Sequence, residues 1–132
     1  MNDLSLLPVT LDDIEEAAKL LDGVIARTPI EVSRALGRQT GANVYFKCEN
    51  LQRAGSFKVR GAYVRMAKLS PSERDRGVVA ASAGNHAQGV AVAAARLGIK
   101  ARIFMPLGVA LPKLAATQGH GAEVVLHGHN VD

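Results

Sequence analysis

The chain has 132 residues, enough for one modest domain, and its composition of 48% hydrophobic and 21% charged residues is typical of a globular protein. Aromatic residues make up only 4%, and the net charge of +4 is spread without a run of like charges. This pattern argues against a nucleic-acid-binding tail or a platform for stacking bases. A single cysteine, Cys48, excludes an internal disulfide. With no leader pattern and no apolar run of membrane-spanning length, we expect a cytoplasmic protein.

The first fifty residues predict short, separate elements. Thr10 is placed to cap a helix whose first turns are rich in Asp and Glu, and Gly23 ends that helix. An extended stretch follows at 27–30, then a short helix near 33–39 and a strand at 43–48. Cys48 closes this strand, and we interpret it as a buried packing residue.

From residue 56 onward the pattern becomes a regular alternation of helices and strands. Strands are predicted at 77–81, 100–105 and 122–126, and helices at 56–69, 85–97 and 111–118. Such alternation predicts an α/β fold with a parallel sheet flanked by helices. We expect this layer to run from about residue 43 to 126, because no hairpin pattern of alternating polarity interrupts it.

Lys58 occupies an unusual place for a lysine, just inside the start of the predicted helix at 56–69. The positive end of the helix dipole disfavours an ammonium group there. The same position suits an amine that must be neutral and nucleophilic, because a positive potential lowers its pKa. The alternative is an ordinary surface lysine that extends from a helix end.

The turn at 82–86, with the sequence Ser-Ala-Gly-Asn-His, joins a strand to a long alanine-rich helix. Free backbone N–H groups at a helix N-terminus bind carboxylates and phosphates. The alternative is ordinary capping of the helix by Ser82 or Asn85.

Several motifs in order along the chain carry a resemblance to one family: Glu49–Gln52, Gly55–Lys58, Arg60–Ala62, Ser82–Val90, Met105-Pro106, Lys113 and Gly121–Gly128. Together they resemble the fold-type II pyridoxal-phosphate enzymes, and within these the threonine dehydratases (threonine ammonia-lyases) and the related serine racemases. The resemblance runs from about Leu7 to the last residue. The residues of the first two motifs are more similar to the catabolic enzymes than to those of isoleucine biosynthesis.

The resemblance implies the two-domain architecture typified by the tryptophan synthase β subunit, of which this chain is the N-terminal portion. Residues 1–50 then belong with the larger domain, and residues 51–132 form most of the small α/β domain. The remainder, including a tetraglycine loop that binds the cofactor's phosphate, is absent from this sequence.

The resemblance also implies a role for each site residue. Lys58 holds pyridoxal 5′-phosphate covalently and serves as the catalytic base, Phe57 packs against the cofactor ring, and Asn85 hydrogen-bonds the ring's phenolic oxygen. Ser82 resembles the base on the opposite face of the cofactor in serine racemases. The substrate carboxylate is held by the turn, through Ser82, Gly84, Asn85 and His86.

The implied reaction is β-elimination of a hydroxy amino acid, from L-threonine to 2-oxobutanoate and ammonia and from L-serine to pyruvate. A racemase and a fragment unable to hold the cofactor are the alternatives, and an unrelated anion-binding module is a third. The resemblance implies an amino-acid substrate and a homo-oligomer in the full-length protein, with no nucleic-acid or membrane partner. His120, His127 and His129 are interpreted as solvent-facing, so no metal site is predicted.

Overall fold

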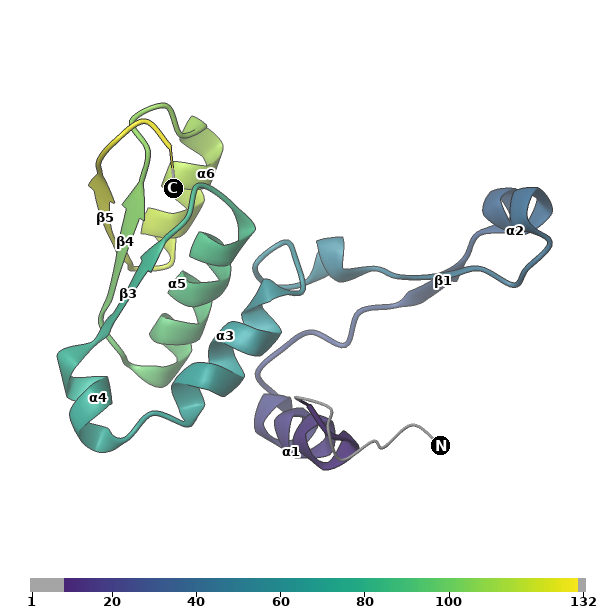
Figure 1. The fold of residues 1–132 in the computed structure, drawn as a ribbon, viewed down its shortest axis with the longest axis horizontal. Coiled ribbons are helices and arrows are strands. Elements are labelled where there is room, and N and C mark those ends of the chain that lie inside the picture. The colour runs from purple at the N-terminus through teal and green to yellow at the C-terminus, as the bar shows by residue number, and fades with distance from the viewer. Residues whose placement is uncertain (1–8, 131–132) are drawn as a thin grey trace.

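The structure, a computed structural model, describes residues 9–130 (Figure 1). The N-terminal half contains α1 (Leu11–Leu21), β1 (Ile30–Val32), α2 (Arg34–Thr40), β2 (Tyr45–Lys47) and a 3₁₀ turn at Glu49–Leu51. The rest contains α3 (Lys58–Ala67), α4 (Pro71–Arg76), β3 (Val78–Ala81), α5 (Asn85–Leu97), β4 (Ala101–Met105), α6 (Leu111–Gly119) and β5 (Glu123–Leu126).

The central feature is a three-stranded parallel sheet in the order β3-β4-β5. Val78 is aligned with Ala101 and Arg102 with Glu123, both in parallel register. Helices α5 and α6 pack on one face, and α3 lies along α5 (Figure 1). The predicted α/β class with a parallel sheet flanked by helices is therefore confirmed.

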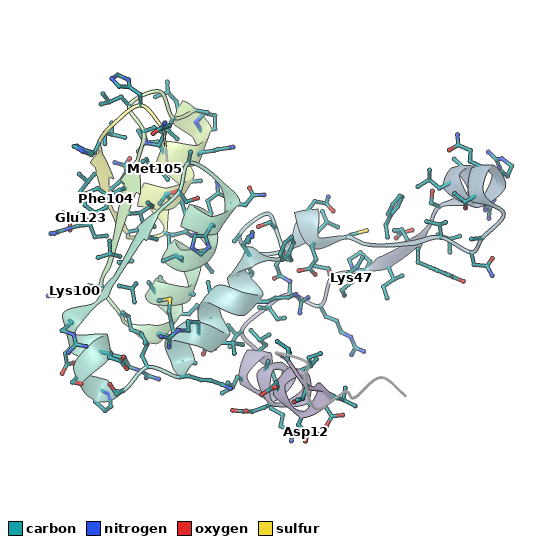
Figure 2. The ribbon with its side chains drawn as sticks, viewed as in Figure 1. Asp12, Lys47, Lys100, Phe104, Met105 and Glu123 are labelled. Atoms are coloured by element: carbon teal, nitrogen blue, oxygen red, sulfur yellow. The ribbon has the colours of Figure 1, made fainter. Side chains whose placement is uncertain are left out.

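The core lies between this sheet and its helices because the strands turn alternate residues toward α5. Ile103 is 0% exposed and Met105 1% exposed, and both pack against the small residues of α5. The opposite face of the sheet carries Val79, which is 71% exposed, and Phe104 (Figure 2). This second face, the open face of the sheet, also carries the exposed pair of Arg102 and Glu123. Parallel sheets are usually covered on both faces.

The prediction that the parallel layer begins near residue 43 is wrong. The strand predicted at 43–48 appears as β2, which pairs antiparallel with β1, Val32 lying opposite Tyr45. The two strands form a narrow ribbon that extends away from the parallel sheet, with α2 at its far end (Figure 1). The hairpin pattern was missing from the sequence because a helix, not a tight turn, joins the strands.

Side chains cap the starts of several helices, and the cap predicted at Thr10 is one of them. Thr10 caps α1 and Ser70 caps α4, and the backbone N–H of each cap residue donates to the carboxylate of the acidic residue three positions later. Cys48, by contrast, is half-buried rather than buried, because it follows the exposed ribbon strand β2. None of the helices between residues 9 and 130 combines the length and apolarity that a membrane crossing requires.

Candidate active site at the start of α3 and the β3–α5 turn

Lys58 is the first residue of α3, so the helix begins two residues later than the predicted residue 56 and still carries Lys58 in its first turn. The next residue, Val59, is 1% exposed and anchors the first turn of the helix. On the other side, the hydroxyl of buried Ser56 accepts a bond from the Lys58 backbone N–H at 3.4 Å. The Lys58 amine itself lies at the surface, 5.2 Å from the centre of the Phe57 ring. The backbone is thus held while the amine and an exposed aromatic face remain accessible.

A partly buried ion pair ties α3 to the preceding segment. Both oxygens of Glu49 accept bonds from the guanidinium of Arg60, each at 2.8 Å, and Thr28 donates to the same carboxylate at 2.6 Å. Arg60, with help from Thr28, lowers the pKa of Glu49 from 4.5 to about 2. Gln52 adds a second tie, since its side-chain amide bonds both the N–H and the carbonyl of Ala26.

The β3–α5 turn differs from an ordinary capped helix start. The N-cap of α5 is Gly84, and no side chain caps the helix there. Ser82 instead accepts a bond from the Gly84 N–H at 3.2 Å, so capping by Ser82 or Asn85 is not what the structure has. Asn85 and His86 are exposed. Within the described residues, the first N–H groups of α5 remain available to an anion.

The structure brings the start of α3 next to the first turns of α5. A Cβ atom placed on Gly89 would lie 3.0 Å from the Lys58 carbonyl carbon and 3.1 Å from the Lys58 Cβ. Gly89 follows Asn85 by one helical turn, about 5–6 Å along the helix. The Lys58 backbone therefore packs against α5 about one helical turn from Asn85, the residue at which the 82–86 turn enters the helix. The individual roles assigned to Phe57, Lys58 and the turn residues remain predictions.

Sequence reasoning gave no role to Lys113, which also lies at this turn. Lys113 belongs to the first turn of α6, and its amine is 3.5 Å from the position of a Cβ on Gly84. In residues 9–130 no hydrogen bond or ion pair engages this amine. The signal was present in the sequence, because a lysine in the first turn of a helix opposes the helix dipole.

Other parts of the described chain do not add to this neighbourhood. A hollow of about 520 Å³ lies between α1 and the Glu49–Arg60 pair, and neither Lys58 nor the 82–86 turn lines it. No group of three histidine, cysteine, aspartate or glutamate side chains within residues 9–130 is arranged to hold a metal ion.

Comparison with known proteins places this geometry in a family. Over 124 residues the chain is 53% identical to the L-threonine ammonia-lyase of Thermotoga maritima, covering 94% of this chain and 31% of that protein. Among solved structures, maize serine racemase superposes with a TM-score of 0.88 at 33% identity, over 95% of this chain and 38% of that one. Threonine deaminase isoform 2 of Solanum lycopersicum gives a TM-score of 0.77 at 40% identity, over 94% and 38%.

The chain thus spans about a third of the length of the relatives it matches. Its residues 21–132 match the model of the family described as pyridoxal-phosphate dependent enzymes. These residues include the whole parallel sheet, the start of α3 and the turn before α5. The chain therefore belongs to the pyridoxal-phosphate dependent enzyme family.

Proposed function

We propose that the complete protein is a lyase that removes water and then ammonia from a hydroxy amino acid. L-Threonine would give 2-oxobutanoate, and L-serine would give pyruvate. The observation that carries this proposal is the packing of the Lys58 backbone against Gly89, one helical turn from Asn85. The identity of 53% with a threonine ammonia-lyase favours threonine as the substrate.

The residues present suit pyridoxal phosphate. An accessible amine on Lys58, an exposed aromatic face on Phe57 and the polar side chain of Asn85 match an aldehyde, a flat ring and a phenolic oxygen. We propose that these three residues hold the cofactor. When bound, the cofactor supplies an electron sink for the charge that develops at the substrate Cα.

The chain's own groups would bind the substrate and move its protons. The N–H groups at the start of α5, with Ser82, Gly84, Asn85 and His86, would hold the substrate carboxylate. A carboxylate held there leaves the Cα proton near the start of α3. Lys58 Nζ would then act as the base that removes this proton.

A racemase is the second candidate, and Ser82 is the residue that would decide it. Its hydroxyl accepts a bond from the Gly84 N–H, which orients the side chain and leaves the O–H proton free to be donated. Two proton-transferring groups on opposite faces of Cα would permit racemisation. Serine racemase is also among the close structural neighbours.

One assay separates the two candidates. The complete protein, supplied with pyridoxal phosphate, is incubated with L-threonine and, separately, with L-serine. The lyase proposal expects release of 2-oxobutanoate and pyruvate with ammonia, measured by reduction with a 2-oxoacid dehydrogenase. Accumulation of D-serine without 2-oxoacid would contradict the lyase proposal and favour the racemase.

We expect residues 1–132 alone to show little or no turnover. A doubly charged phosphate needs several N–H donors or cations, and the sequence contains no run of glycines of the kind that supplies them. A cofactor held only at its aldehyde end is poorly oriented, and orientation contributes roughly 7–11 kcal/mol in favourable cases. The measurement compares 2-oxobutanoate release by the 132-residue chain and by the complete protein. Equal rates would contradict this expectation.

We also propose that residues 1–50 pack with a larger domain and that the complete protein is a cytoplasmic homo-oligomer. The ribbon of β1 and β2 supports the first point, because Ile30, Val32 and Tyr45 are each about 60% exposed. Apolar surface of this kind is usually covered in a complete protein. The single free cysteine, Cys48, suits a reducing compartment.

A further inference from the structure

Gly89 lies buried within α5, where glycine is the least favourable helix residue after proline. Its lack of a side chain has a direct steric reason. A Cβ atom at this position would stand 3.0 Å from the Lys58 carbonyl carbon, 3.0 Å from the Val59 nitrogen and 3.1 Å from the Lys58 Cβ. Two of these three atoms are backbone, which cannot rotate away as a side-chain tip can.

Buried side chains hold α3 against α5 both next to Gly89 and farther along the helix pair. Val59 is 1% exposed and packs with Val92, which lies three residues beyond Gly89 on α5. Farther along α3, Met66 is 4% exposed and is part of the main core with α5. Figure 1 shows the two helices side by side. Because Val59 and Met66 hold α3 against α5, a bulkier residue at 89 would be accommodated by a small displacement at the point of contact, the turn that carries Lys58.

We propose that Gly89 is a positioning residue for Lys58, setting how closely the amine-bearing turn of α3 approaches the 82–86 turn of α5. This inference rests on the proposed function, in which Lys58 and that turn act on one substrate. Gly89 touches the Lys58 backbone and belongs to the same helix as the turn. It therefore couples the two segments without contacting the substrate.

The decisive variant is Gly89→Ala in the complete protein, with two controls. The added methyl group needs a shift of only a few tenths of an ångström, so the variant is expected to fold. Gly119→Ala is the matched helix control, because a Cβ there meets nothing within 4 Å. Met66→Ala is the destabilised control, because it opens a cavity in the same helix pair away from Lys58.

Two measurements are made on each protein. The first is the rate at which pyridoxal phosphate becomes attached to Lys58 of the cofactor-free protein, trapped with borohydride and located by mass spectrometry. The second is the split between kcat and KM for threonine. We expect Gly89→Ala to slow attachment and to lower kcat by about tenfold with little change in KM, since misplacement by 1 Å costs about 100-fold. Gly119→Ala should match the wild type. Met66→Ala, whose thermal unfolding is recorded as well to confirm that it is destabilised, should melt earlier while keeping its attachment rate.

Three results would overturn the proposal: Gly89→Ala behaves like Gly119→Ala, Met66→Ala loses attachment as much as Gly89→Ala, or Gly89→Ala does not fold. The last counts because the proposal requires the helix pair to yield by a small displacement. A wild-type protein that attaches no cofactor at Lys58 would instead refute the proposed function, a separate outcome visible before any variant is compared.

Discussion

Replacing Lys58 with alanine in the complete protein should lower threonine turnover by about 10³-fold or more, because a single side chain would lose two tasks. The amine at the start of α3 would no longer hold the cofactor, and the base proposed for the Cα proton would be lost. The near-visible absorption of lysine-bound pyridoxal phosphate should vanish together with 2-oxobutanoate release.

Lys68 provides a matched control on the same helix. It is also an exposed lysine, but it lies at the far end of α3, where it pairs with Glu16 at 3.1 Å. Lys68→Ala should therefore keep both the absorption band and the turnover. If Lys58→Ala retained more than about a tenth of wild-type turnover, Lys58 would not be the base.

Replacing Glu49 with glutamine should destabilise the folded protein by about 2 kcal/mol at neutral pH. The pKa of Glu49 falls from 4.5 to about 2, chiefly because of Arg60, and a change of this size corresponds to about 3 kcal/mol. The Arg60 side chain stays 33% exposed, so water screens part of this energy. Thermal unfolding of the complete protein measures this destabilisation. Comparing Glu49→Gln, Arg60→Gln and the double variant isolates the interaction energy of the ion pair.

The pH dependence of this contribution has a definite sign. A carboxylate whose pKa is lowered on folding stabilises the protein fully above its unfolded pKa of 4.5. That stability is lost as the pH falls from 4.5 toward 2. The difference between the wild type and Glu49→Gln should therefore be constant near pH 7 and shrink across this acid range.

The exposed pair between Arg102 and Glu123 is the matched control. Its N–O distance is also 2.8 Å, but both side chains are more than half exposed, and Glu123 lies on the open face of the sheet (Figure 2). Glu123→Gln should change the melting temperature much less than Glu49→Gln. Equal effects would mean that burial of Glu49 adds nothing to the pair.

Much of the fold follows from signals between residues close in sequence. The capping pairs at Thr10 and Ser70, the helix start at Lys58 and the strands near 78, 101 and 123 all depend on patterns within a few residues. The parallel order follows from strand–helix alternation, because a helix between two strands returns the chain to the same edge of the sheet. The spacing of residues close in sequence is therefore enough to predict whether a segment is a helix or a strand and that the strands of this sheet run parallel.

By itself, the sequence determined the class of fold, the starts of α5 and α6 and, through its motifs, the family. Only the tertiary structure decided that β2 pairs with β1, that Arg60 meets Glu49, that Lys113 lies over Gly84 and that Gly89 touches Lys58. Periodicity tells which face of an element is buried but not which distant element covers it. These contacts join residues separated by 11 to 31 positions, so their partners emerge only when the helices and strands pack together.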